Sequence, residues 1–395
     1  MTLKEKETLD RIIENEVLRG YVNGVSARVI WKDKIIYSGN FGFADREKSK
    51  KMSDNTIFRL FSMTKPITAA AVMILAEREK LSLEDRVSEY LPEFAGQKIL
   101  LEDGREVPAK RESTIFDLLN MTSGIPYPSQ DSLAGMQMEK ILKRMIRERE
   151  RGVQKSTREW ISSIAEGPLC FQPGERWKYG FSADILVGIV EVAAEKRFSE
   201  FLRTELFEPL DMEDTAFFVP KEKRERFAQI YQWDSNLEML VPYEESHLGE
   251  YYGEDVGFES GGAGLVSTIE DYSHFASMLL HRGTYSGRRI LKEQTVEYMT
   301  KNHLSDAQKK ASIRETGYGY GCLMRIAEES DTTGGISLGE YGWDGWTGNY
   351  FTIHPHEELI LLYFVQRCGA GGMPLQAAIR EIREVIYSSL ETKKM

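Results

Sequence analysis

A serine and a lysine three residues apart are the pair with the clearest chemical potential in this sequence. The segment Phe61-Ser62-Met63-Thr64-Lys65-Pro66 runs into the helix-forming stretch Ile-Thr-Ala-Ala-Ala-Val-Met-Ile-Leu. Because proline is tolerated only in the first turn of a helix, Pro66 places Ser62 at or next to a helix amino terminus. Residues i and i+3 share one helix face, so we expect the Lys65 amine beside the Ser62 hydroxyl.

This pairing would make Ser62 a nucleophile. A serine hydroxyl reacts poorly until a base removes its proton, and a lysine can be that base when burial or neighbouring positive charge disfavours its ammonium form. The partial positive charge of a helix amino terminus also stabilises an alkoxide or oxyanion nearby. Since Ser-x-x-Lys occurs by chance in many chains, the pair is a hypothesis that needs wider context.

Five ordered segments provide this context. They are Phe58-Arg-Leu-Phe-Ser62-Met-Thr-Lys65, Thr114-Ile-Phe-Asp-Leu-Leu-Asn-Met-Thr-Ser-Gly124, Phe207-Glu-Pro-Leu-Asp-Met-Glu-Asp-Thr-Ala-Phe217, Gly261-Gly-Ala-Gly-Leu-Val-Ser-Thr-Ile-Glu-Asp-Tyr272 and Gly339-Glu-Tyr-Gly-Trp343-Asp-Gly345. Together they resemble the serine β-lactamase and penicillin-binding-protein superfamily, in its class C-type branch. The last segment, running into Gly348 and Pro355, is most similar to the family VIII carboxylesterases. The resemblance covers roughly residues 5–390 and implies a β-lactamase-like α+β fold.

The resemblance also implies a role for each matching residue. Ser62 matches the acylated nucleophile, and Lys65 matches its base partner. Tyr179, in Gly174-Glu-Arg-Trp-Lys-Tyr-Gly180, matches the tyrosine whose oxygen shuttles a proton. The backbone N–H of Trp346 would complete an oxyanion hole with the N–H of Ser62, and one such donor contributes about 10²–10³ in rate.

Two departures from the pattern of the superfamily bear on the substrate. The usual Tyr-x-Asn is Tyr179-Gly180-Phe181 here, so the asparagine that would hydrogen-bond a β-lactam side-chain amide is missing. The Lys-Thr-Gly motif corresponds to Trp343-Asp344-Gly345, which replaces a cation with an apolar face and one N–H donor. Small neutral esters therefore fit better than penicillins, with Trp343 and Gly345 as substrate-binding residues. In the alternative register, Trp346-Thr347-Gly348 corresponds to Lys-Thr-Gly. The backbone N–H that completes the oxyanion hole then lies three residues further along the chain.

The elements that must position these groups follow from hydrophobic periodicity. Residues 25–31 and 35–41 read as one β-hairpin, and residues 350–353 and 359–366 read as another. Helical patterns cover 3–19, 66–79, 114–121, 136–151, 158–166, 182–196, 198–207, 268–281, 292–301 and 375–390. We therefore expect one antiparallel sheet built from both ends of the chain and flanked by helices, with an inserted, mostly helical domain.

The corresponding domain boundaries are residues 1–60 with 261–395 for the sheet domain and 61–260 for the helical domain. The active site is expected in the cleft between them. In the irregular stretch 220–260, five aromatic residues are expected either to line this cleft or to be ordinary packing: Tyr231, Trp233, Tyr243, Tyr251 and Tyr252.

Composition narrows the class of partner. The chain has 395 residues with 51 Lys+Arg against 62 Asp+Glu, a formal net charge of −11, which argues against nucleic acid. Three widely spaced cysteines suggest neither a disulfide framework nor a zinc site. The amino terminus lacks the apolar run of a signal peptide, and no segment reaches the ~18 apolar residues of a membrane span. We expect a soluble cytoplasmic protein that acts on a small molecule, and the sequence leaves its oligomeric state open.

Other motifs are weaker. His354-x-His356 lies in a turn between two strands with no evident third ligand, so a solvated turn is expected rather than a metal site. Gly317-Tyr-Gly-Tyr-Gly321 lacks dinucleotide-binding spacing and reads as a strand approached closely by backbone.

These observations predict a serine hydrolase that acts through an acyl-enzyme, without a metal or organic cofactor. A carboxylesterase on small neutral esters is the preferred interpretation. The alternatives that keep the same site are a β-lactamase, a D-amino-acid amidase or peptidase, and an acyltransferase. A catalytically silent binding or assembly protein on the same scaffold is the alternative of another class.

Overall fold

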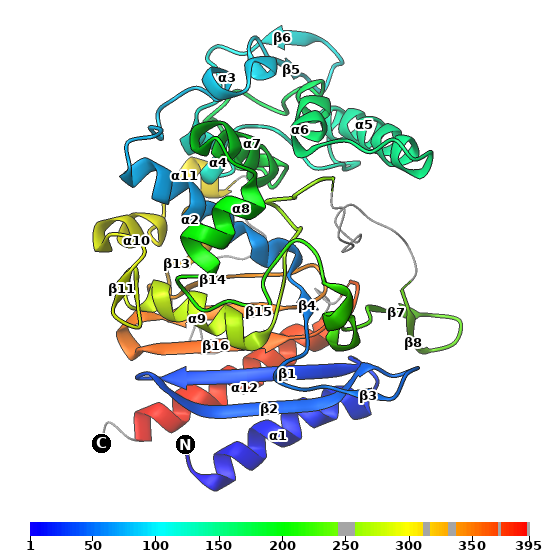
Figure 1. The fold of residues 1–395 in the computed structure, drawn as a ribbon, viewed down its shortest axis with the longest axis vertical. Helices are drawn as coiled ribbons and strands as arrows, with labels where there is room; N and C mark the ends of the chain where they lie inside the picture. The colour runs from blue at the N-terminus through cyan, green and yellow to red at the C-terminus, as the bar shows by residue number, and fades with distance from the viewer. Residues whose placement is uncertain (244–256, 311–316, 331–336, 370–372, 393–395) are drawn as a thin grey trace.

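The fold is organised around one eight-stranded sheet. The computed structural model describes residues 1–243, 257–310, 317–330, 337–369 and 373–392. The strand order is β12-β13-β14-β15-β16-β1-β2-β3, and all neighbouring strands are antiparallel (Figure 1). The strands are β1 (Gly24–Trp31), β2 (Lys34–Asp45), β3 (Lys50–Lys51), β12 (Tyr318–Tyr320), β13 (Arg325–Ala327), β14 (Tyr341–Asp344), β15 (Tyr350–His354) and β16 (Leu359–Phe364). Because β1 pairs with β16, the sheet joins both ends of the chain, as predicted.

Both predicted hairpins are confirmed. The β1–β2 turn places Lys32 and Asp33 at φ 48° and 62°, the conformation that suits a tight hairpin turn. The β15–β16 connection is a short 3-10 turn, η5 (Pro355–Glu357), closed by Glu358 at φ 52°. Residues 318–320 of the glycine-rich segment form β12, and a Cβ at Gly321, directly after this strand, would overlap the backbone carbonyl oxygen of Met299. The expected close approach to this strand is therefore confirmed.

Helices cover both faces of the sheet. Leu361 and Tyr363 of β16 join the cluster made with α1 (Leu3–Leu18) and α12 (Met373–Thr392), whereas Ile360 and Leu362 join the cluster on the other face. There, α9 (Ile269–Leu280) packs on β16. Since alternate residues of a strand face opposite sides, a strand buried on both faces becomes a continuous apolar run.

The remaining helices lie mostly above the sheet in Figure 1. They are α2 (Thr64–Glu77), α3 (Val87–Tyr90), α4 (Ile115–Leu119), α5 (Leu133–Glu150), α6 (Thr157–Ala165), α7 (Ser182–Ala194), α8 (Phe198–Leu202), α10 (Glu293–Met299) and α11 (Asp306–Lys310). Helix α2 is buried on all sides and packs on α7, as expected for a helix that is apolar all round. Because α2 is packed on all sides, the position of its first turn is fixed.

Short elements depart from the predicted pattern. The helix expected over 198–207 ends at Leu202 and continues as a π-helix, η3 (Arg203–Phe207). Four two-stranded pairs were not predicted, because runs of two to four residues carry too little periodicity. They are β4 (Phe58–Arg59) with β9 (Val266–Ser267), β5 (Lys98–Leu100) with β6 (Glu106–Pro108), β7 (Tyr231–Asp234) with β8 (Met239–Pro242), and β10 (Thr284–Tyr285) with β11 (Arg288–Arg289). The domain boundaries stay a prediction.

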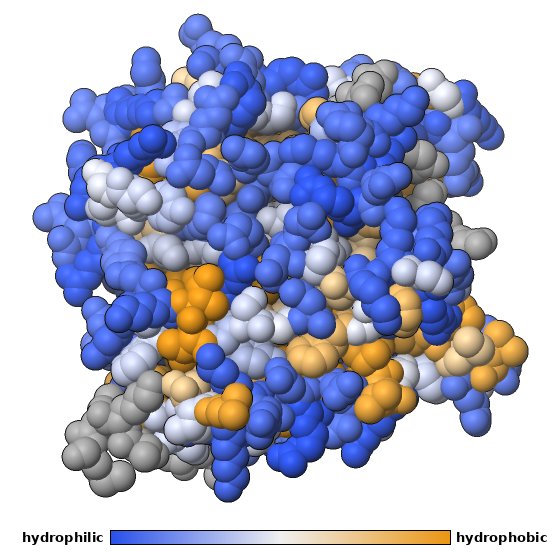
Figure 2. Space-filling view, turned by 60° about the horizontal axis from the view of Figure 1, so that its bottom comes forward, coloured by the Kyte–Doolittle hydropathy of each residue, from blue (hydrophilic) through white to orange (hydrophobic). Residues whose placement is uncertain are grey.

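The surface seen in Figure 2 is mostly hydrophilic and carries separate hydrophobic patches. Within the described parts of the chain, no helix combines the length and the apolar character needed to cross a membrane.

Candidate active site

Ser62 lies in a strained turn between β4 and α2. It is the middle residue of a 3-10 turn, η1 (Phe61–Met63), and α2 begins two residues later at Thr64. Phe61 has φ 46°, a left-handed conformation that is costly for a residue with a Cβ. Its ring packs edge-on against Trp346, with the centroids 5.3 Å apart. The turn thus leaves Ser62 half-buried at the start of α2.

Lys65 lies in the first turn of α2 and is completely buried. Its Nζ donates to the Ser62 hydroxyl at 3.2 Å, to Tyr127 Oη at 3.1 Å and to the Gly262 carbonyl at 2.7 Å. An ammonium group has three N–H donors, so these three acceptors satisfy it fully. A buried amine that contacts a serine hydroxyl can accept the serine proton once it has lost one of its own.

Tyr127 is the contact of Lys65 that the sequence analysis missed. It follows the Thr122-Ser123-Gly124 end of a quoted family segment and lies between two prolines, Pro126 and Pro128, but no spacing tied it to Ser62. Burial raises the pKa of the Tyr127 phenol well above its usual value, with the Asp184 charge adding to the effect. Tyr127 therefore stays a neutral phenol, which can accept one hydrogen bond and donate another.

Gly180 allows the loop that carries Tyr127 to pack closely against Tyr179. A Cβ at Gly180 would overlap the carbonyl oxygen of Ile125, so only glycine lets this loop pass so close. The Tyr127 ring then packs edge-on against the rings of Tyr179 and Phe181, with centroid distances of 5.4 Å and 4.6 Å. In the sequence, Gly180 stands out only as the middle residue of the changed Tyr-x-Asn motif.

Tyr179 presents its ring rather than its oxygen to Lys65. The ring centroid lies 4.6 Å from Lys65 Nζ, within cation–π range. Its Oη accepts a hydrogen bond from Trp343 Nε1 at 3.3 Å. Tyr179 thus adjoins the Ser62–Lys65 pair, and Trp343 orients its phenolic oxygen.

The segment predicted to replace Lys-Thr-Gly lies beside the Ser62 turn. Trp343 belongs to β14, which contacts η1, and a Cβ at Gly345 would lie 2.6 Å from the Leu60 carbonyl oxygen. The Trp346 ring contacts Phe61, as described above, and remains 42% exposed. This placement brings the backbone of residues 345–346 next to that of residues 60–62. Which of the two registers corresponds to Lys-Thr-Gly stays a prediction.

The predicted aromatic lining has mixed outcomes. Tyr243 contacts the Trp346 ring at 5.8 Å, next to the site. Tyr231 is buried, and its Oη accepts from the Arg46 backbone N–H, so it serves packing. Trp233 is exposed on the β7–β8 hairpin. Tyr251 and Tyr252 lie outside the described residues.

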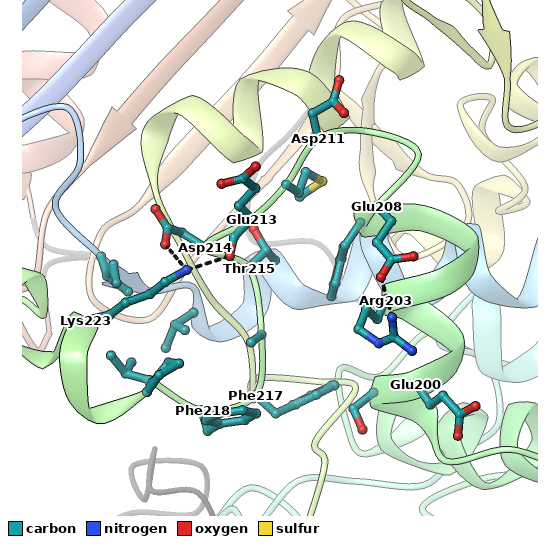
Figure 3. A pocket seen from close by; sticks show the side chains of 18 residues that line it. Glu200, Arg203, Glu208, Asp211, Glu213, Asp214, Thr215, Phe217, Phe218 and Lys223 are labelled. Carbon is teal, nitrogen blue, oxygen red and sulfur yellow. Dashed lines mark hydrogen bonds and ion pairs between the residues drawn. The ribbon is translucent and has the colours of Figure 1, made fainter.

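A cavity of about 610 Å³ lies away from these residues (Figure 3). Its lining is largely apolar, and its charged side chains include the pairs Arg203–Glu208 and Lys223–Asp214. Neither Ser62 nor any of the three contacts of Lys65 lines this cavity. It is therefore not the candidate active site.

The expectation of a solvated turn is correct for His356, which is exposed in the 3-10 turn η5, but wrong for His354, which ends β15 and has a buried side chain. Burial lowers the pKa of His354. Among the described residues, no group of three or more His, Cys, Asp or Glu side chains is placed to hold a metal ion.

Comparisons with known proteins agree with this architecture. The family model described as Beta-lactamase matches residues 9–383. Protein Rv1367c of Mycobacterium tuberculosis is 30% identical over 372 residues, covering 91% of this chain and 90% of that protein. Esterase EstB of Burkholderia gladioli is 27% identical over 388 residues, covering 94% and 93%. The solved structure of EstCE1, a hydrolase with promiscuous acyltransferase activity, shares the fold with a TM-score of 0.79 at 21% identity, covering 97% of this chain and all of that one.

Proposed function

Because this chain belongs to the Beta-lactamase family, we propose that it is a serine hydrolase that forms an acyl-enzyme on Ser62 and acts on small neutral esters. The observation that carries the proposal is the buried Lys65 amine, which lies 3.2 Å from the Ser62 hydroxyl at the start of a helix. The similarity to esterase EstB supports the choice of an ester bond.

In the proposed reaction, Ser62 Oγ attacks the ester carbonyl while its proton passes to neutral Lys65. The oxyanion receives hydrogen bonds from the backbone N–H groups of Ser62 and Trp346. As the carbon–oxygen bond to the alcohol breaks, Tyr179 passes its phenolic proton to the leaving oxygen. The Tyr179 oxygen, which accepts from Trp343 in the structure, then has to turn toward Lys65 to regain the proton that the lysine took from Ser62. Water then attacks the acyl-enzyme, releasing the acid and restoring the Ser62 hydroxyl.

The preference for neutral esters rests on Trp343. Its indole is half-buried beside Tyr179, at the position where the related Lys-Thr-Gly motif carries a cation. An indole supplies an apolar face and one N–H, which Tyr179 already accepts. A substrate carboxylate would lose its hydration here without gaining a cationic partner, so the site favours substrates without charge.

The test combines active-site labelling with a substrate panel. A fluorophosphonate is expected to add once, on Ser62, as measured by intact mass and peptide mapping. Ser62→Ala should abolish the adduct, whereas Ser235→Ala, on the exposed β7–β8 turn, should leave it unchanged. Among p-nitrophenyl esters, D-alanyl amides and nitrocefin, short esters should react fastest. Faster hydrolysis of nitrocefin would refute the ester preference, and the lack of any adduct from neutral to alkaline pH would favour a binding role.

Acyl transfer is the second candidate, and the EstCE1 likeness favours it. The same acyl-enzyme would then be attacked by an alcohol instead of water. Product analysis with a p-nitrophenyl ester and increasing 1-butanol distinguishes the two reactions. A butyl ester that exceeds the free acid at low butanol concentration would indicate a transferase.

A further inference from the structure

Asp184 is a buried carboxylate that the proposed reaction does not use. It lies in the first turn of α7, three residues after Phe181, and is only 2% exposed. Its Oδ1 accepts hydrogen bonds from the Ser260 hydroxyl and, at 3.1 Å, from the Gly262 backbone N–H. A buried carboxylate is retained in a fold only when such partners offset its lost hydration.

The Gly262 residue connects Asp184 to the catalytic lysine. Its N–H donates to Asp184, and its carbonyl oxygen accepts from Lys65 Nζ at 2.7 Å. The adjacent Gly261 carbonyl accepts from Thr68 Oγ1 at 2.8 Å, which fixes this loop to α2 as well. The loop is thus held between α7 and α2, and its position determines where the Lys65 acceptor lies.

The approach is so close that a side chain at residue 262 would displace its neighbours. A Cβ there would lie 2.7 Å from Asp184 Oδ2 and 2.8 Å from Tyr127 Oη. Distances under 3.0 Å to a Cβ require a neighbour to move. Asp184, Tyr127 and Lys65 therefore meet around a single small residue.

Electrostatic attraction is a second link between Asp184 and Lys65. Burial raises the pKa of the Asp184 carboxyl, and the positive charge of Lys65 is the largest influence that opposes this rise. Coulomb interaction is mutual, so an ionised Asp184 stabilises the ammonium form of Lys65. Among the described residues, the other groups that contact Lys65 are the Ser62 hydroxyl, the neutral Tyr127 phenol, the Tyr179 ring and the Gly262 carbonyl. None of these four groups is a carboxylate, whereas Asp184 is.

We propose that Asp184 is a positioning residue for Lys65: it anchors the Gly262 carbonyl against the lysine, and its negative charge favours the ammonium form of the lysine over the neutral amine. This inference rests on the proposed function. It gives a role to the Asp184 carboxylate of α7, which lies one helical turn after Phe181, the last residue of the changed Tyr-x-Asn motif. The carboxylate touches neither Ser62 nor the substrate, and it acts through Gly262 and through its charge.

The test compares Asp184→Asn with Glu191→Gln. Asparagine keeps the shape and one acceptor oxygen but removes the charge, whereas Glu191 lies on the same helix and bonds the Phe198 backbone N–H instead. The rate of fluorophosphonate labelling is measured against pH. Because removal of the negative charge favours the neutral amine, the midpoint of the labelling profile should fall by roughly one pH unit in Asp184→Asn, whereas Glu191→Gln should retain the wild-type midpoint.

A folded Asp184→Asn variant with the wild-type midpoint would overturn the proposal. If Asp184→Asn does not fold, Ser260→Ala removes one anchor and keeps the charge. It should slow labelling roughly five-fold with little change in midpoint, and an unchanged rate would equally overturn the proposal.

A readout that needs no activity separates this inference from the proposed function. In protein with ¹³Cε-labelled lysine, the Lys65 resonance is assigned with Lys65→Met and followed against pH. The pH at which this resonance titrates should be lower in Asp184→Asn than in wild type. If the wild-type protein is never labelled by the fluorophosphonate, the proposed function fails, and the NMR titration still decides whether Asp184 controls Lys65. If labelling proceeds and both midpoints are unchanged, only the role of Asp184 fails.

Discussion

Replacing Glu16 with glutamine is expected to stabilise the protein at neutral pH. Glu16 lies in the last turn of α1, faces the sheet and is only 7% exposed. Its Oε2 is buried, and the described structure records no hydrogen-bond partner for it. Burial raises the pKa of this carboxyl to about 7, against opposing influences from Arg19 and Arg367. The carboxyl end of a helix also disfavours a negative charge.

The magnitude follows from linkage. An unperturbed glutamate has a pKa of 4.5, so below this value both the folded and the unfolded state hold the proton and the group contributes nothing. Between pH 4.5 and 7 the unfolded state ionises while the folded state does not, so stability falls as pH rises. At ~1.36 kcal/mol per pH unit, the loss from this carboxyl reaches about 3 kcal/mol and stays constant above pH 7.

Urea unfolding at pH 4.5 and pH 7.5 measures this effect. The free energy of unfolding of Glu16→Gln, relative to wild type, should increase by about 3 kcal/mol between the two conditions. The matched control is Glu14→Gln, because Glu14 lies on the exposed side of the same helix. Its difference from wild type should be the same at both pH values. A Glu16→Gln difference that is also independent of pH would refute the reasoning, since the carboxyl would then ionise equally easily in both states.

Three further substitutions test the site and its support. Tyr127→Phe removes an acceptor from Lys65 and should slow acylation by p-nitrophenyl acetate about five- to ten-fold, roughly the value of one hydrogen bond, in stopped-flow measurements. An unchanged rate would show that this contact is dispensable. Trp343→Phe keeps an aromatic ring but loses the N–H that orients the proposed proton donor, so kcat/KM for short esters should fall roughly five-fold while the melting temperature changes little. Glu340→Gln deprives the buried Arg383 of its ionic partner and should lower the free energy of unfolding by about 3–5 kcal/mol in urea. A loss below 1 kcal/mol would mean that the pair is effectively solvated.

The sequence predicts well those features that depend on local spacing. The two long hairpins and the major helices follow from periodicity, because side-chain burial repeats every two residues in a strand and about every 3.6 in a helix. Pro66 indicates where α2 begins, and the i, i+3 spacing predicts that Lys65 faces Ser62, as their 3.2 Å contact shows. The family motifs extend this information to Tyr179 and Trp343, although not to the contact between them.

Only the tertiary structure shows how separate segments converge on the lysine. Tyr127, Asp184 and Gly262 come from three loops and helices far apart in the chain, and each contacts another of the set within hydrogen-bond distance or through a close backbone approach. None carries a local pattern, because a tyrosine between prolines, an acid in a helix or a glycine in a loop is ordinary in isolation. These residues matter to the Lys65 amine because the site is buried. Where water is excluded, a single nearby charge or carbonyl oxygen interacts strongly with an amine. Local spacing thus determined the proposed reactive pair, Ser62 and Lys65, and long-range packing decided which groups surround it.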